Sequence, residues 1–178
     1  MKDIELRLIA ELMKNSRRSD RELAKIIGVS QPTVSRTIKR LDKEEYIKEY
    51  TAIPDFTKLG FEIMSISFAK LKEPISEEKL QEIREQFRQT QLKEPISTIV
   101  AMSGMGCNAD RVIIAFHENY SAYTEFLDKI RQHPSVDIEK ISSFLINLND
   151  RSHYRSLTLS HLADYITYKK RQESEGES

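Results

Sequence analysis

Residues 19–41 constrain this chain more than any other stretch, because their helix signals follow one another at helix-turn-helix spacing. Ser19 and Glu22 have the form of a capping box, in which a hydroxyl caps a helix and a carboxylate reaches back to it. Gly28 stands where the C-terminus of a helix favours a residue with positive φ. Ser30 is the next candidate N-cap, and a proline follows in the first turn, where its missing N–H costs little. These signals predict two short helices joined by a tight turn.

The second helix of this pair has an apolar face and a basic face. At about 100° per residue, Val34, Ile38 and Leu41 fall on one narrow arc, which we assign to the core. The opposite face carries cations and hydrogen-bonding groups, which a helix needs in order to enter a major groove. A basic face that is only solvated is the alternative, but the caps, the turn glycine and the basic face together favour DNA binding. We expect base contacts from Gln31, Ser35, Arg36 and Lys39, and phosphate contacts from Thr33, Arg40, Lys43 and the loop residues Arg17 and Arg18.

Charge and cysteine content restrict the function classes. The formal net charge of the 178 residues is zero, but residues 1–50 carry a balance of +3 and the remainder a balance of −3. A slightly basic N-terminal domain fits local attraction to DNA. The one cysteine, Cys107, excludes an intramolecular disulfide framework. Because the sequence shows neither a signal peptide nor an apolar run long enough to span a membrane, we expect a cytoplasmic protein.

The N-terminal domain is predicted to span residues 1–53. Its first helix runs from Asp3 to Asn15, with apolar residues at helical spacing. After the basic helix, residues 46–53 partly alternate apolar and polar side chains, which predicts a short strand pair or wing. Three helices and a wing make a winged helix-turn-helix, and residues 54–60 are then a linker or hinge.

A change of period at Phe61 marks a second domain, predicted over residues 61–148. Strands are expected at 61–71, 97–103, 111–117 and about 138–148. The expected helices are capped by Ser76 and Asn119. Their buried residues are predicted to be Leu80, Ile83 and Phe87 in the first helix, and Tyr123, Phe126, Leu127 and Ile130 in the second. The order is βαββαβ, a ferredoxin-like arrangement, and the fold class is α+β.

Both faces of the predicted sheet are apolar, although two helices can cover only one of them. A second copy of the sheet would bury the other face, so the sequence predicts dimerisation through residues 61–148. Residues 149–178 form an extension in which Leu162, Tyr165, Ile166 and Lys169 predict a further helix after Ser160. We expect disorder from Glu173 onward.

The segment 104–110 is predicted to be a loop between the second and third strands, with the chemistry to bind an amino acid. Gly104 and Gly106 allow backbone amides to approach and donate to a carboxylate. Asp110 can accept from an ammonium group, and Met105 lies between the two glycines. The alternative is a glycine-rich turn in which Asp110 only caps the backbone.

The layout of residues 1–148 resembles the leucine-responsive regulators, the Lrp/AsnC or feast/famine family. The resemblance implies transcription control by a DNA-binding domain and a ligand-sensing domain. It also implies dimers, often octamers, and small molecules, usually amino acids, that bind near the loop between the second and third strands. The residues that carry it are 4–12, 15–17, 23–30, 34–41, 46–47 and 58–60.

Two other function classes remain open. A related group with this two-domain layout decarboxylates sirohaem, although those proteins tend to lose the basic outer face of the third helix, which is intact here. An architectural protein that binds DNA without an effector is the other alternative. The sequence shows no nucleophile–base arrangement, no phosphate-binding glycine loop and no metal-ligand spacing among its histidines. We therefore expect neither an enzyme nor a bound cofactor beyond the amino-acid effector.

Overall fold

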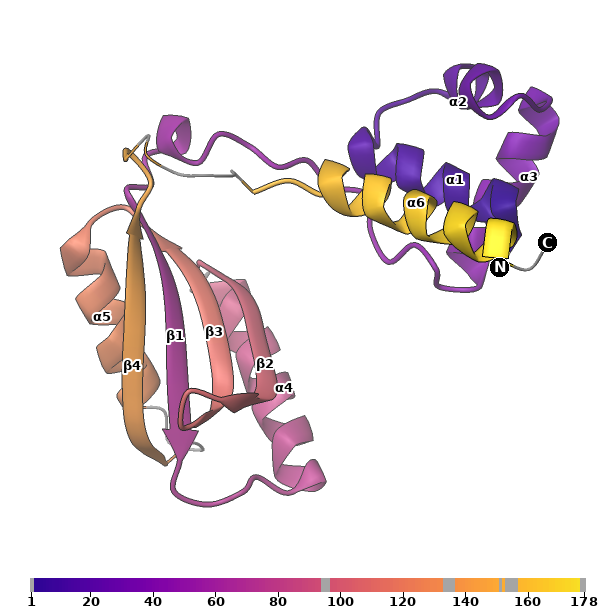
Figure 1. Cartoon of the computed structure of the whole chain (residues 1–178). Coiled ribbons are helices and arrows are strands. Elements are labelled where there is room, and N and C mark those ends of the chain that lie inside the picture. Colours follow the sequence, from indigo (N-terminus) through magenta and orange to yellow (C-terminus); the bar gives the residue numbers. More distant parts are fainter. Residues whose placement is uncertain (1, 94–96, 133–136, 151, 153–156, 177–178) are drawn as a thin grey trace. The chain divides into compact units, whose positions relative to one another are not determined.

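The computed structural model describes residues 2–93, 97–132, 137–150, 152 and 157–176 (Figure 1). The chain divides into two compact units. The first combines Met1–Pro54 with Tyr154–Ser178, and the second is Asp55–His153. Both ends of the chain therefore belong to the same unit. None of the described helices is both long and apolar enough to cross a membrane.

Three helices form the helix-turn-helix of the first unit: α1 (Asp3–Lys14), α2 (Asp20–Ile27) and α3 (Gln31–Lys43). The local signals act as predicted. The hydroxyl of Ser19 accepts a hydrogen bond from the N–H of Glu22 at 3.3 Å, and the Glu22 carboxylate accepts from the N–H of Ser19 at 2.8 Å. Gly28 ends α2 with φ 82°, a conformation that costs a residue with a Cβ more than it costs glycine. Ser30 caps α3 through the N–H of Thr33.

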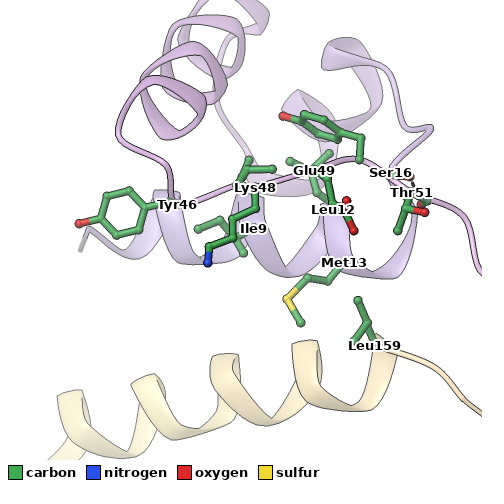
Figure 2. A pocket seen from close by; sticks show the side chains of 11 residues that line it. Ile9, Leu12, Met13, Ser16, Tyr46, Lys48, Glu49, Thr51 and Leu159 are labelled. Carbon is green, nitrogen blue, oxygen red and sulfur yellow. Dashed lines mark hydrogen bonds between the residues drawn. The ribbon is translucent and has the colours of Figure 1, made fainter. Parts of the chain in front are cut away.

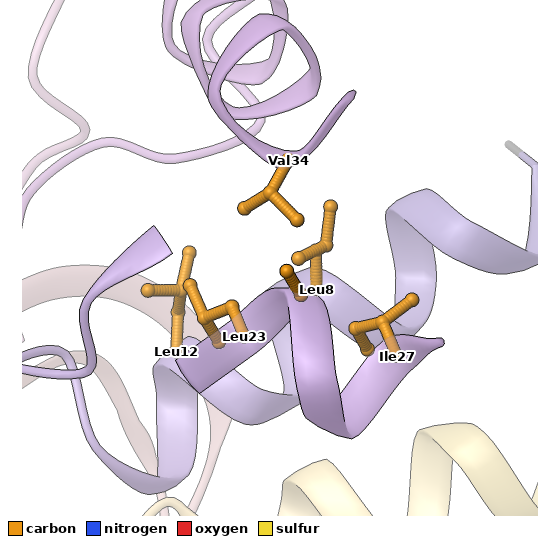
Figure 3. Close-up of a cluster of buried hydrophobic side chains, with 6 residues drawn as sticks. Leu8, Leu12, Leu23, Ile27 and Val34 are labelled. Atoms are coloured by element: carbon orange, nitrogen blue, oxygen red, sulfur yellow. The ribbon is translucent and has the colours of Figure 1, made fainter. Parts of the chain in front are cut away.

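The core of this unit lies where the three helices meet (Figure 3). Leu8 of α1, Leu23 of α2 and Val34 of α3 are fully buried and point toward one another. Leu12 and Ile27 extend the cluster on either side. This apolar contact fixes α3 by its inner face, and its basic face is left outward.

The predicted strand pair at residues 46–53 is wrong, because the structure has no strand there. The segment contains no glycine, asparagine or proline with which the chain could reverse direction. It runs instead as a single extended piece held by side chains. The Ser16 hydroxyl donates to the carbonyl of Thr51 at 3.0 Å, and the Tyr50 hydroxyl donates to Asp42 at 2.9 Å. Partial burial and the Asp42 carboxylate raise the pKa of Tyr50 to about 12.

The C-terminal helix α6 (Ser160–Gly176) packs against α1. Ala163 is fully buried at this contact, and Asp164 forms an ion pair with Lys14 at 2.8 Å. Hydrogen bonding to Asp164 raises the pKa of Lys14, and the same bond lowers the pKa of Asp164. Figure 2 shows Leu159, just before α6, close to Met13 of α1, where both line a mostly apolar hollow of about 330 Å³. The helix includes residues 173–176, where the sequence predicts disorder.

The second unit is a four-stranded antiparallel sheet with two helices, in the predicted βαββαβ order. Its strands lie in the order β2-β3-β1-β4, and Thr57–Leu59 form a 3-10 turn before the first of them. The elements are β1 (Ile63–Leu71), α4 (Glu77–Lys93), β2 (Thr98–Gly106), β3 (Ala109–His117), α5 (Tyr120–Arg131) and β4 (Ile138–Asn147).

One face of the sheet is covered by helices, and several of the side chains on it are small or polar. Ser65 and Ser67 of β1 are fully buried there, and the Ser65 hydroxyl lies 2.8 Å from Nε2 of His117 on β3. The His117 ring contacts Tyr123 and Phe126 of α5. Burial lowers the pKa of His117, which favours the neutral imidazole in this packed position. In α4, Ile83 is buried as predicted, whereas the side chain of Phe87 lies outside the described residues.

Candidate nucleic-acid interface

The outer face of α3 presents a row of polar side chains to solvent. Gln31, Arg36, Lys39 and Lys43 are exposed, and Ser35 is half-buried beside them. Within the part of the chain that the structure describes, none of these five side chains has a hydrogen-bond or ion-pair partner. Their donors are therefore available to a ligand at no cost in internal contacts. The cap at Ser30 and the proline that follows it leave the N-terminal turn of α3 exposed as well.

Three other residues from the predicted DNA-binding set already have internal partners. The guanidinium of Arg40 forms an ion pair with Glu5 of α1, and that of Arg18 forms one with Glu11. Arg18 also donates to the backbone carbonyl of Glu11 at 3.1 Å. The Thr33 hydroxyl lies 2.8 Å from the Ser30 hydroxyl, in the cap of α3. The remaining member, Arg17, is exposed in the loop after α1.

The Arg40–Glu5 pair fixes α3 to α1 from the polar side. Glu5 is 8% exposed, which is unusual for a glutamate. Its pKa is lowered first by the backbone N–H of Lys2, which donates to it at 2.9 Å, and then by Arg40. Sequence reasoning missed this pair because its members are 35 residues apart and carry no local spacing signal.

The predicted 104–110 loop is a continuation of two strands. β2 extends to Gly106 and β3 begins at Ala109, so the turn consists of Cys107 and Asn108 alone. Both have positive φ, 52° and 51°, as a two-residue hairpin turn of type I′ requires. The pairing shifts between Ser103 and Gly106, which places Gly104 and Met105 in a bulge. The Met105 side chain is fully exposed.

Asp110 lies on β3 next to this bulge and already has three partners, one of which is the guanidinium of Arg111 at 3.7 Å. Its carboxylate oxygens are 3.3 and 3.4 Å from the N–H of Leu71 on β1. The ammonium of Lys70 lies 3.5 Å away. The carboxylate is 30% exposed, so part of it still faces solvent. The backbone contact is the one that the turn-capping alternative predicts, and it leaves acceptor positions open on a group that has about four of them.

Comparison with known proteins supports DNA binding by the N-terminal helices of the first unit. Residues 1–48 match the model of a family described as winged helix-turn-helix DNA-binding. The chain is 28% identical over 141 residues to an HTH-type transcriptional regulator from Pyrococcus abyssi, a match that covers 78% of this chain and 90% of the relative. It is 41% identical over 69 residues to the transcriptional regulator LrpC of Bacillus subtilis, over 39% of this chain and 48% of LrpC.

Solved structures extend the likeness to both units. The structure of B. subtilis LrpC matches with a TM-score of 0.65 and 25% identity, over 87% of this chain and 99% of LrpC. A transcriptional regulator from Neisseria meningitidis, solved in complex with L-methionine, matches with a TM-score of 0.67 and 19% identity. That match covers 91% of this chain and 99% of the other. The second likeness concerns the fold alone.

Proposed function

We propose that the chain is a DNA-binding transcriptional regulator of the Lrp/AsnC type, and that it binds its operator as a dimer whose DNA affinity is set by a small amino acid. Three parts of the molecule carry the proposal. They are the outer face of α3, the uncovered face of the sheet, and the bulged end of the β2–β3 hairpin.

The observation that carries the DNA-binding part is the row of polar side chains without internal partners on α3. Gln31 and Arg36 can form paired hydrogen bonds with base edges, and the arginine contact with guanine is the commonest of these. Lys39, which we expect to contact bases, lies on the same face, and Lys43 lies further along, where a cation reaches the phosphate backbone. Arg40 contributes through α1, because its pair with Glu5 sets the angle at which α3 is presented.

We expect Arg36→Ala to weaken operator binding by about 1–3 kcal/mol for each half-site and to relax the base preference at one position. The measurement is a footprint titration on DNA recovered with the protein from its own genome. Arg88→Ala is the matched control, because Arg88 is an exposed arginine on α4 in the other unit. Unchanged operator affinity in Arg36→Ala would remove this side chain from the interface.

The dimer part of the proposal concerns the sheet face opposite α4 and α5. Ile66 and Phe68 of β1 lie on it, between Ile114 and Val112 of β3 on one side and β4 on the other. Phe144 of β4 is 65% exposed. A contiguous apolar surface of this kind on a soluble protein marks an interface. We propose a second copy of the chain as its partner, because an isologous contact would pair two recognition helices for two half-sites about 34–36 Å apart.

The effector part of the proposal concerns Gly104, Met105, Gly106 and Asp110. The bulge exposes backbone amides that can donate to a carboxylate, and Asp110 retains exposed acceptor positions for an ammonium group. The L-methionine complex of the structural neighbour supports an amino acid as the ligand class. Such a ligand shifts DNA affinity only by its differential affinity for two states of the protein.

Calorimetry with the twenty amino acids tests this part. We expect one of them to bind and Asp110→Ala to reduce that binding at least tenfold, because hydrogen bonds to charged groups contribute about 1.5–3 kcal/mol. Asp137→Ala is the control, since Asp137 is an exposed aspartate in the same unit that pairs with Lys72. Equal binding by Asp110→Ala would leave Asp110 as a backbone cap and place the effector elsewhere.

A further inference from the structure

A cavity of about 610 Å³ lies in the second unit, on the face of the sheet that the helices cover. It is bounded by α4, by the end of α5 and by the strands β1, β2 and β3. Small-molecule sites are typically clefts or cavities of about 300–1,000 Å³ with mostly apolar walls. The walls here are mostly aliphatic, which fits that description.

The hollow follows from the sizes of the facing side chains. On the sheet side the lining includes Ala69 and Ala101, and on the helix side it includes Leu80 and Ile83. A helix on a sheet closes its interface when large side chains on one layer interdigitate with those of the other. Methyl groups on the sheet side leave that space open. Arg84, Ala101 and Ser103 of its lining are exposed, so a ligand can enter it from solvent.

The polar groups of the cavity are cationic or neutral. Arg84 of α4 and Arg111 of β3 both line it, together with the hydroxyl of Ser103. Among the described residues that line it, there is no aspartate or glutamate. Arg111 donates to the carbonyl of Asp110 at 2.7 Å and lies 3.7 Å from the Asp110 carboxylate, and its guanidinium has other N–H donors. Arg84 is exposed at the opening of the cavity, and within the described ranges it has no ion-pair partner.

From this combination we infer a second ligand site, for a small carboxylic acid with an apolar body. The alkyl or aryl portion lies between α4 and the sheet, against Ala69, Ala101 and Ile83. The carboxylate lies between Arg84 and Arg111, whose planar guanidinium groups match a carboxylate with paired hydrogen bonds. An amino acid fits less well, because the described lining offers no acidic side chain for its ammonium group.

The two sites of this unit are neighbours on one strand. Asp110, in the proposed amino-acid site, and Arg111, in the cavity, are consecutive on β3, and the Arg111 guanidinium lies 3.7 Å from the Asp110 carboxylate. Arg111 also holds the backbone carbonyl of Asp110. The cavity differs from the hairpin site in its lining and in ligand class, and its proposed ligand is independent of the effector proposed above.

Calorimetry with hexanoate, octanoate and decanoate on the full-length protein tests the cavity. We expect saturable binding of octanoate, and binding of octanol at least tenfold weaker, because the alcohol lacks the charge that Arg84 and Arg111 recognise. Arg84→Gln is expected to weaken octanoate binding about tenfold, and Ala101→Leu to abolish it by filling the hollow. Arg88→Gln is the matched control, since Arg88 lies on the same helix but does not line the cavity.

Two outcomes would overturn the site: no saturable binding of any of the three acids, or wild-type octanoate affinity in both Arg84→Gln and Ala101→Leu. Because Arg84 is exposed, its variant is expected to fold and decides the question if Ala101→Leu does not. Titration of Asp110→Ala with octanoate separates the two sites. Because Asp110→Ala removes a carboxylate beside Arg111, octanoate binding is expected to be retained or to tighten in that variant, and loss of binding would mean that the acid occupies the hairpin instead.

Discussion

Replacing Phe144 with aspartate is expected to convert the protein from a dimer into a folded monomer. Phe144 is 65% exposed in the protomer, so the substitution removes little packing within one chain. In the proposed dimer the same position lies in the apolar face next to Ile66, and an aspartate there would be buried without a partner. A buried unpaired charge costs about 3–5 kcal/mol, and the two-fold axis applies that cost twice.

Sedimentation equilibrium at micromolar concentration measures the result directly. Operator affinity is expected to fall about 10²–10⁴-fold in the same variant. In a dimer, binding of one helix-turn-helix to its half-site makes binding of the second one intramolecular, and a monomer loses this gain. Tyr120→Asp is the control. Tyr120 is 62% exposed on α5, at the side of the sheet that the helices cover, so this variant should remain dimeric. A dimeric Phe144→Asp protein would place the subunit contact on another surface.

The features that sequence predicted well are those fixed by neighbours along the chain. The capping box at Ser19, the left-handed Gly28 and the cap at Ser30 depend on residues at most four positions away, so their spacing carries the full signal. The βαββαβ order follows in the same way from the change between two-residue and helical periods.

The features that it predicted poorly depend on contacts between distant segments or on turn chemistry. The pair of Arg40 with Glu5 and that of Lys14 with Asp164 join residues far apart in the chain, and nothing local distinguishes such an arginine from one on a free surface. The hairpin was predicted as a loop because its glycines look like turn residues. The turn is made instead by Cys107 and Asn108, which adopt positive φ although neither is glycine.

Truncation of one core leucine is expected to unfold the DNA-binding unit while the second unit stays folded. Leu8 is fully buried among Leu23, Ile27 and Val34, where the three helices of the head converge (Figure 3). Leu8→Ala should lower the free energy of unfolding of this unit by about 2–5 kcal/mol, through lost burial and the cavity left behind. A unit this small has a limited core, so a loss of that size approaches its whole stability.

Differential scanning calorimetry measures the effect, because two compact units can give two transitions. Each 1 kcal/mol lost from the free energy of unfolding lowers the melting temperature of a domain of 60–100 residues by about 4–8 °C. The transition of the DNA-binding unit should therefore move down by ~10 °C or more. Leu162→Ala is the matched control: its leucine is 50% exposed on α6 in the same unit and should shift little. If Leu8→Ala lowered both transitions together, the two units would be one cooperative structure, and DNA binding could not be lost without also losing the ligand-binding unit.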